Sequence, residues 1–292
     1  MSYDDLNLNE ENFSLIHTVG RENYIFLNND SNYELKQHYS ENTLNKFDEK
    51  RFRRSYNSKL KFCQERGIIY KFYVVPDKSI VCRDYLPITP KIQKRNYDSI
   101  SDLAKDFLTI LEPCDYYKSD SHINFEGALK YSSHILHDIR SDIPAEKYYE
   151  ALKENLIVSE VAVEGDICKF SEPDITKKEI IKQYFFPLME QSGKYEYLDD
   201  GFEIPEKFRK VGTRDSVYVK NRFSLSDMKC LLLRDSTSNR FINPLNVFFR
   251  SLFAYWDHWN FNTQLVDWYK PDIIMEIRTE RFLEGMKYTV LD

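Results

Sequence analysis

The chain has 292 residues, of which 42% are hydrophobic and 15% aromatic, so it can bury a large apolar core without disulfides or metal ions. Its 41 basic and 47 acidic residues give a formal net charge of −6, and the densest basic cluster, residues 50–54, falls within a helical pattern typical of a solvated face. Nucleic acid is therefore not an expected partner. The five cysteines are widely spaced and contain no CxxC pair, which indicates free, mostly buried thiols.

The segment Met1–Asp5 is acidic and lacks the basic start and apolar core of a secretory signal. No apolar run approaches the roughly 20 residues that a membrane-spanning helix needs. As written, the sequence predicts a cytosolic protein with no direct membrane span. If the chain is a piece of a longer exported protein, the prediction is a periplasmic one.

The first half of the chain contains one strong helix-to-strand pattern. A strand-like patch at Tyr24–Leu27 comes first, after a turn. From about 42 to 66, apolar residues recur at helical spacing, and Gly67 follows where a C-terminal cap is expected. Residues 68–75 are rich in β-branched and aromatic side chains and stop at Pro76, which predicts a buried strand.

The remaining expected elements, in chain order, are helices over 99–111, 125–139 and 145–156, a strand over 230–233, a helix over 243–256 and a strand over 272–277. The stretch from about 158 to 225 alternates short strand-like pieces with polar turns, which suggests an inserted β-rich region. Strands that alternate with helices favour a mostly parallel sheet covered on both faces, a three-layer α/β/α fold. We expect one domain over residues 1–292, with ligands bound beyond the carboxyl ends of the strands.

A candidate nucleophile follows the strand expected at 230–233. A serine hydroxyl is a weak nucleophile that needs a base, a carboxylate to orient the base, and donors for the oxyanion. Among the Asp-Ser dipeptides, only Asp235-Ser236 follows a buried-strand pattern. Ser236 would therefore project from the carboxyl edge of the sheet, where its backbone N–H could bind an oxyanion. The alternative is that Asp235 or Ser236 merely caps a turn.

The candidate base is His122, because Asp120 precedes it by two residues. In a turn, this spacing lets the carboxylate reach Nδ1 of the imidazole and leaves Nε2 for the serine. The alternative is that Asp120 caps the helix beginning near Phe125 and that His122 is an ordinary surface residue. His258, which follows an aromatic-rich segment, is the reserve candidate for the base or else a packing residue.

Two further groups of polar residues have the chemistry of a possible site. His134 and His137 have an i, i+3 spacing that metal sites use, but no carboxylate or cysteine partner is obvious nearby, so no metal is expected. Asn239 lies close enough to Ser236 in sequence to be a candidate substrate-binding or oxyanion-binding residue.

Several segments carry a resemblance that is distributed along the chain. They are Gly20–Leu27, Gly67–Tyr70, Val74–Lys78, Tyr85–Pro87, Tyr117–Asn124 with Gly127 and Ala128, Leu233–Ser236, Lys270–Ile274 and Glu280–Leu283. In this order they resemble the SGNH-hydrolase-like domain of the alginate O-acetyltransferase family and related polysaccharide acetylation proteins. Tyr117–Asn124 is similar to the family's Asp-x-His block, and Leu233–Ser236 stands where the family has its Gly-Asp-Ser turn. Arg234 replaces the glycine of that turn, and Ile123 replaces the tryptophan usual after the histidine.

The resemblance implies an SGNH-type serine acyltransferase with Ser236, His122 and Asp120 as its catalytic triad. It would move an acetyl group to a hydroxyl of a capsular or other surface polysaccharide, or of its precursor, without a bound cofactor. The expected donor is acetyl-CoA in the cytosol, or a membrane-bound partner if the chain is exported. Expected partners are the carbohydrate acceptor and polysaccharide-biosynthesis proteins.

Three alternatives remain open at this point. The same triad would make a carbohydrate acetyl esterase if water replaced the sugar hydroxyl. The departures at Arg234 and Ile123 suggest instead a catalytically degenerate SGNH-like protein that binds glycans or acts as a scaffold. Arg234 is interpreted either as a cation that binds an anionic sugar or the acetyl donor, with Asn239 beside it, or as a solvated side chain.

Overall fold

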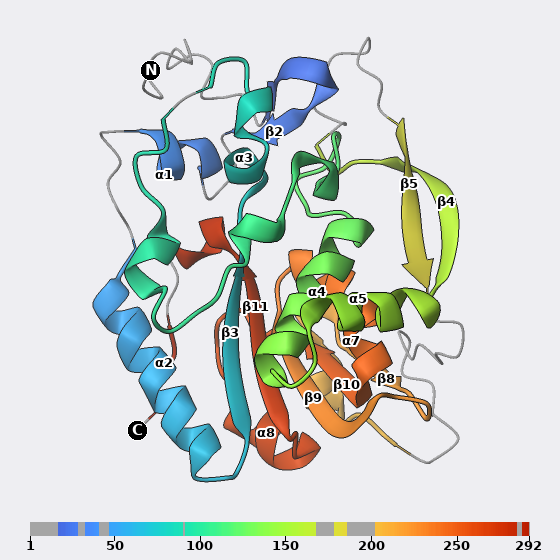
Figure 1. The fold of residues 1–292 in the computed structure, drawn as a ribbon. Coiled ribbons are helices and arrows are strands. Elements are labelled where there is room, and N and C mark those ends of the chain that lie inside the picture. The colour runs from blue at the N-terminus through green and yellow to red at the C-terminus, as the bar shows by residue number, and fades with distance from the viewer. Residues whose placement is uncertain are drawn as a thin grey trace.

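A computed structural model describes residues 17–28, 33–40, 47–89, 91–167, 178–185, 202–284 and 288–291. Its centre is a five-stranded sheet in the order β3–β11–β9–β10–β8 (Figure 1). The first four strands are parallel to their neighbours, and β8 is antiparallel to β10. The strands are β3 (Ile69–Val75), β8 (Val217–Lys220), β9 (Ser226–Arg234), β10 (Phe249–Tyr255) and β11 (Ile273–Thr279). The predicted mostly parallel sheet is confirmed.

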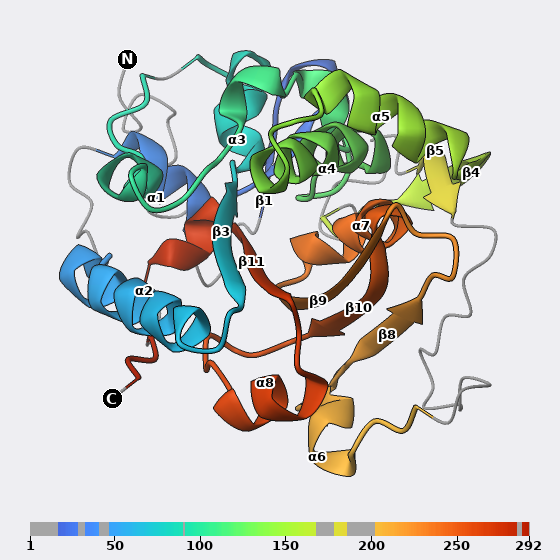
Figure 2. The ribbon, with the colours of Figure 1, turned by 60° about the horizontal axis from the view of Figure 1, so that its bottom comes forward.

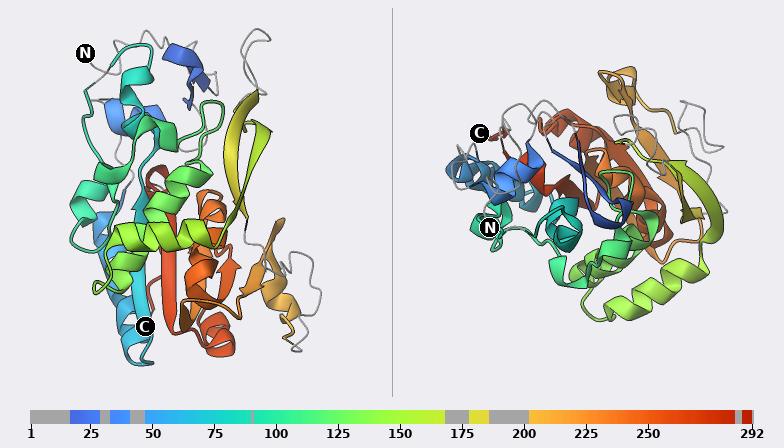
Figure 3. Two further views of the ribbon diagram at one scale, coloured as in Figure 1. Left: turned by 45° about the vertical axis from the view of Figure 1, so that its right-hand side comes forward. Right: turned by 90° about the horizontal axis from the view of Figure 1, so that it is seen from above.

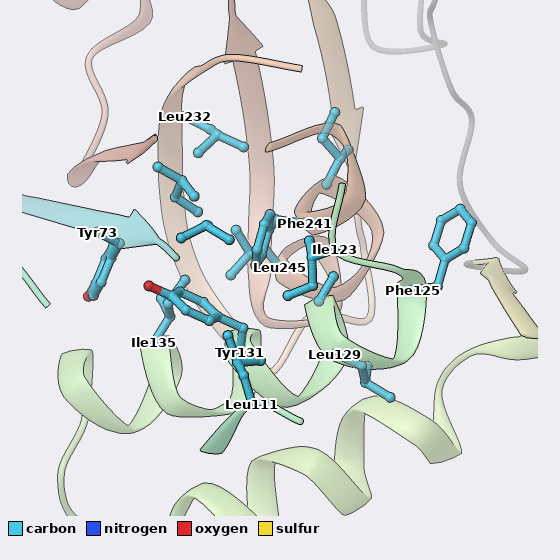
Figure 4. Packing of buried hydrophobic residues seen from close by; sticks show 14 of the residues in the cluster. Tyr73, Leu111, Ile123, Phe125, Leu129, Tyr131, Ile135, Leu232, Phe241 and Leu245 are labelled. Carbon is cyan, nitrogen blue, oxygen red and sulfur yellow. The ribbon is translucent and has the colours of Figure 1, made fainter. Parts of the chain in front are cut away.

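Helices cover both faces of this sheet (Figure 2). One face packs against α4 (Phe125–Ile139), α5 (Ala145–Glu154) and α7 (Ile242–Phe248), and the other packs against α2 (Glu49–Gln64) and α8 (Thr263–Tyr269). Successive residues of a strand point to opposite faces, so Leu232 joins the first cluster and Leu231 and Leu233 join the second. Figure 4 shows α4 side chains, among them Tyr131 and Ile135, in the first cluster. The predicted three-layer α/β/α arrangement is confirmed.

The predicted helix-to-strand unit is present as α2 and β3. Asp48 accepts a hydrogen bond from the backbone N–H of Arg51 and caps α2, which begins later than the sequence pattern suggested. Gly67 has φ +67°, the left-handed conformation that ends the helix and turns the chain into β3. Residues 42–46 of the predicted helix lie outside the described residues.

Two helix predictions were wrong. The segment 99–111 contains short 3₁₀ turns, η5 (Asn96–Ile100) and η6 (Leu108–Ile110), because Lys105 pairs with the edge of β3 and holds the chain extended there. Only the first half of the helix expected over 243–256 exists, as α7, and the rest is β10. β10 is an apolar run buried between two strands, and such a run cannot be distinguished from a buried helix by periodicity alone.

The range 158–225 contains more than an insertion. Strands β4 (Ile157–Glu164) and β5 (Lys178–Phe185) form an antiparallel hairpin beside α4 (Figure 3). The pair β6 (Lys210–Val211) and β7 (Arg214–Asp215) follows the short helix α6 (Glu206–Arg209), and β8 then enters the central sheet. Residues 168–177 and 186–201 of this range lie outside the described residues.

The remaining elements are β1 (His17–Val19), β2 (Ile25–Leu27), α1 (Glu34–Tyr39), α3 (Lys78–Val81) and the 3₁₀ turns η3 (Arg21–Asn23), η4 (Arg83–Tyr85), η7 (Pro113–Asp115), η9 (Thr237–Phe241) and η10 (Glu280–Leu283). Cys63, Cys82 and Cys230 are buried free thiols, Cys114 is exposed, and Cys168 lies outside the described residues. Among the helices of the described ranges, none combines the length and apolar character that crossing a bilayer requires.

Candidate active site

The structure brings Ser236, His122 and Asp120 into one hydrogen-bonded chain. Nε2 of His122 lies 2.9 Å from the Ser236 hydroxyl oxygen, although the two residues are 114 positions apart in sequence. Nδ1 of His122 lies 2.6 Å from a carboxylate oxygen of Asp120. Asp120 is buried, and His122 and Ser236 are partly buried, so all three groups are largely shielded from solvent. This order matches the geometry that an activated serine requires.

The turn after β9 aims the Ser236 hydroxyl at the imidazole. One oxygen of the Asp235 carboxylate accepts from the backbone N–H of Ser238 at 3.2 Å, and the other accepts from the backbone N–H of Thr279 at 2.8 Å. Asp235 therefore caps the turn, which confirms the alternative interpretation for this residue. The Ser236 side chain makes no capping hydrogen bond. The backbone N–H of Ser236 has no acceptor among the described residues, so it is available to an oxyanion.

The loop before α4 places the imidazole. The N-terminal cap of α4 is Asn124, whose side chain accepts from the backbone N–H of Gly127, so the suggestion that Asp120 caps this helix is wrong. One Asp120 oxygen also accepts from the backbone N–H of His122 at 2.9 Å, and the other accepts from the backbone N–H of Asp166 at 3.2 Å. These backbone hydrogen bonds fix the position of the Asp120 carboxylate beside the imidazole.

Electrostatics favour an ionised Asp120. Burial alone would raise the pKa of Asp120, but the hydrogen bond and charge of His122, together with two backbone N–H groups, lower this pKa well below its usual range. An ionised carboxylate accepts a hydrogen bond from Nδ1–H of the imidazole, and this tautomer leaves the Nε2 lone pair facing the Ser236 hydroxyl.

The β4–β5 hairpin supplies three residues that support this loop and that the sequence analysis missed. Asp166 accepts from the backbone N–H and the hydroxyl of Ser121, both at 2.9 Å, and its carboxylate lies 3.5 Å from Nδ1 of His122. Glu179 accepts from the backbone N–H groups of Lys118 and Ser119, both at 2.9 Å. These carboxylates are distant in sequence from Asp120, and no local pattern marked them.

Gly165, the third residue, lies against the loop so closely that only glycine fits. A Cβ atom there would lie 1.9 Å from the carbonyl oxygen of Ser119 and 2.5 Å from the backbone nitrogen of Asp120. Since real Cβ atoms do not approach backbone this closely, any side chain at Gly165 would displace the loop that carries the imidazole.

Lys78 holds the same loop from the interior. Its ammonium donates to the carbonyl oxygens of Lys118 and Asp120, both at 2.9 Å, and to that of Ile25 at 2.6 Å. Lys78 is 1% exposed, and burial lowers its pKa to about 8. A buried ammonium that donates to three carbonyl groups thus joins β2 to the loop beside the imidazole.

Arg234 and Asn239, the predicted substrate-binding residues, line one cavity of about 440 Å³. The Arg234 guanidinium donates to the side-chain oxygen of Asn239 and, at 2.5 Å, to the backbone oxygen of Asp215. Arg214 and Trp256 line the same cavity. Arg234 is 5% exposed, so the interpretation of it as a solvated side chain is wrong.

The two departures from the family pattern have structural explanations. Arg234 is the last residue of β9 and is not among the residues with positive φ, so its Cβ causes no strain in the turn. Ile123 is fully buried and packs into the core below α4. Neither residue disrupts the serine–imidazole contact.

The other histidines lie elsewhere. His258, the reserve candidate for the base, is exposed and accepts a hydrogen bond from the indole N–H of Trp256 at 3.3 Å. Among the described histidines, His122 is the one that contacts the Ser236 hydroxyl. His137 contacts the backbone oxygen of Ile143 at 2.7 Å, and His134 packs on the ring of Phe107.

Two groups of described residues have the composition of a metal site: Asp120, His122 and Asp166, and Glu112, Cys114 and Asp115. In the first group, both nitrogens of His122 already contact Asp120 and Ser236. In the second, Asp115 is ion-paired with Lys130 at 2.8 Å. Internal contacts therefore account for both groups, and we assign no metal to either.

The three-layer arrangement around a mostly parallel sheet is an SGNH-hydrolase-like fold. No family model and no curated protein sequence matches the chain. Solved structures do match its fold. PatB1 of Bacillus cereus superposes with a TM-score of 0.60 at 14% identity, covering 84% of this chain and 94% of that one.

Two further structures show the same fold. A DHHW family protein of Eubacterium siraeum has a TM-score of 0.57 at 14% identity, covering 92% of this chain and 95% of that one. The O-acetyltransferase domain of Pseudomonas putida AlgJ has a TM-score of 0.53 at 13% identity, covering 94% and 95%. At the level of the fold, the chain is thus similar to an O-acetyltransferase domain, as the sequence resemblance implied.

Proposed function

We propose that the chain is a serine-dependent O-acetyltransferase that acts on a carbohydrate hydroxyl, with Ser236 as nucleophile, His122 as base and Asp120 as the orienting carboxylate. The observation that carries the proposal is the 2.9 Å contact between Nε2 of His122 and the Ser236 hydroxyl. The fold shared with the AlgJ O-acetyltransferase domain supports the choice of acetyl as the transferred group.

In the proposed reaction, His122 takes the hydroxyl proton as the Ser236 oxygen attacks the acetyl carbonyl carbon. The bond from that carbon to the donor breaks, and the donor's leaving group takes the proton from His122. A sugar hydroxyl then gives its proton to His122 and attacks the acetyl-serine, and Ser236 recovers a proton as the sugar ester leaves. The Ser236 backbone N–H would stabilise the oxyanion in both steps.

The proposed acceptor is a capsular or other surface polysaccharide or its precursor, and the proposed donor is acetyl-CoA, which would place the reaction in the cytosol. Detection of a longer, cleaved precursor in cells would argue for the periplasm and for a membrane-bound partner that supplies the acetyl group. No bound cofactor enters the proposed steps.

The test compares wild-type protein with Ser236→Ala and Asp120→Asn, using acetyl transfer from acetyl-CoA and from 4-nitrophenyl acetate to oligosaccharides. We expect kcat to fall by about 10⁴-fold in each variant, because the triad acts as a unit. Normal turnover by Ser236→Ala would refute the mechanism. Ser132→Ala, a buried serine of α4 that donates to its own helix, is the matched control.

A carbohydrate acetyl esterase would use the same three residues. The two functions differ in the product: acetate release that does not depend on an added oligosaccharide would identify the esterase, whereas an acetylated oligosaccharide identifies the transferase. Covalent labelling of Ser236 by a fluorophosphonate would exclude a degenerate glycan-binding protein. PatB1, which has a similar fold, is also known with a sulfonyl adduct, and this motivates the use of a covalent reagent here.

A further inference from the structure

A buried arginine without an anionic partner lies at the end of the strand that leads to Ser236. Arg234 is 5% exposed, and no ion pair among the described residues includes its guanidinium, although the Asp235 and Asp215 carboxylates lie near enough to raise its pKa. Its two terminal nitrogens donate to neutral oxygens, of Asn239 and of the Asp215 backbone, and its Nε is buried without a hydrogen-bond partner. Burying an unpaired charge is costly, so the arrangement favours an anion that is supplied from outside the chain.

A second arginine faces the same cavity. The guanidinium carbons of Arg214 and Arg234 lie 4.8 Å and 5.6 Å from the centre of the Trp256 ring. Burial is the main cause that lowers the pKa of Arg234, to about 10; the Asp235 carboxylate opposes it, the Arg214 charge acts in the same direction as burial, and the Asp215 carboxylate opposes it again. Two guanidinium groups therefore face one cavity together with a single acidic residue, Asp215, and a bound anion would supply the second counter-charge.

The cavity is lined by residues on both sides of the proposed nucleophile in sequence, Arg234 and Asn239. Asn239 lies three residues after Ser236, and its backbone N–H donates to the Ser236 carbonyl oxygen at 3.3 Å. In a 3₁₀ turn, residues i and i+3 share one face and are separated by about 6 Å along the axis. Asn239, which accepts from Arg234, therefore connects the cavity with the face on which the Ser236 hydroxyl lies.

We propose that the cavity walled by Arg214, Arg234 and Trp256 binds the carboxylate or phosphate group of an acidic sugar in the acceptor, so that the chain selects anionic glycans. The inference rests on the proposed function for the identity of the acceptor. Guanidinium groups suit both anions, because their N–H donors pair with two oxygens at once.

Binding measured without turnover tests the proposal. Ser236→Ala protein is titrated by calorimetry with trigalacturonic acid, with neutral galactotriose and with galactose 6-phosphate. We expect at least one acidic sugar to bind tenfold or more tightly than galactotriose, with an affinity that falls as salt rises. A charge-assisted hydrogen bond accounts for about tenfold in affinity, so Arg234→Gln and Arg214→Gln should each weaken acidic-sugar binding by about that factor.

The controls separate the possible outcomes. Arg250→Gln removes an exposed arginine at the opposite end of β10, which pairs with Asp227, and should leave binding unchanged. Arg214 is exposed, so its variant reports on the cavity even if Arg234→Gln fails to fold. The ratio of trigalacturonic acid to galactose 6-phosphate affinity distinguishes a carboxylate from a phosphate.

Equal affinities for acidic and neutral sugars, or arginine variants that bind as the parent does, would overturn the proposal. So would arginine-dependent binding of coenzyme A without binding of either acidic sugar, since the cavity would then serve the donor. If wild-type protein transfers no acetyl group while acidic sugars still bind through both arginines, only the proposed catalytic function fails.

Discussion

Replacing Lys78 with methionine removes the buried ammonium that donates to the carbonyl oxygens of Ile25, Lys118 and Asp120. At neutral pH two effects oppose each other. Three carbonyl groups lose their donor, at about 1 to 3 kcal/mol each. In return, the variant no longer buries a charge, and the interval between a pKa of about 8 in the folded chain and 10.5 in the unfolded one corresponds to about 3 kcal/mol.

The pH dependence of this variant does not depend on how those two effects balance. Because the folded-state pKa of Lys78 is lowered, the unfolded chain binds more protons between about pH 8 and 10.5, and wild-type stability contributed by this group rises over that range. We therefore expect the free energy of unfolding of wild type, relative to Lys78→Met, to increase by up to about 3 kcal/mol from pH 7.5 to 10.5. Urea unfolding at several pH values measures the difference.

The exposed Lys61 gives the matched control, since Lys61→Met should show no such trend. At pH 7, kcat for acetyl transfer should fall in Lys78→Met, because the loop beside His122 loses its inner support. A stability difference that stays constant or shrinks as pH rises would refute the assignment of Lys78 as a buried, destabilised ammonium.

Two further predictions concern groups around the same sheet edge. Burial alone would lower the pKa of His38, but its hydrogen bond to Asp77 and the nearby carboxylates raise this pKa to about 9. The stability that protonated His38 contributes should therefore be complete below pH 6.5 and be lost as pH rises through 9. We expect the unfolding free energies of wild type and His38→Gln to converge by about 3 kcal/mol over this range. Gly165→Ala should lower kcat by about 10²-fold through displacement of the Ser119 carbonyl, with stability measured in parallel; unchanged kinetics would show that the contact does not position the imidazole.

The sequence predicted the elements whose patterns are local. The helix before Gly67, the strand after it and the strand before Ser236 were all expected, because periodicity, a left-handed cap and apolar runs are properties of neighbouring residues. The helix expected over 99–111 failed because a contact distant in sequence, between Lys105 and β3, overrode the local preference. The C-terminal half of the helix expected over 243–256 failed because β10 is buried on both faces.

The site divides in the same way. Asp120 and His122 are two residues apart, so their contact followed from a turn, and Ser236 followed from its place at the end of a strand. Asp166 and Lys78 could not have been found, because they reach the loop from 46 and 42 residues away. Such contacts depend on tertiary packing, which no single-sequence pattern encodes.

The hairpin β4–β5 sets a limit on how far this chain can be shortened. A trimmed version that kept the five strands and all three proposed catalytic residues would still lose the carboxylates of Asp166 and Glu179 from the loop before α4. The imidazole would then be held on one side only. The smallest unit that preserves its alignment must therefore include this peripheral ribbon as well as the sheet.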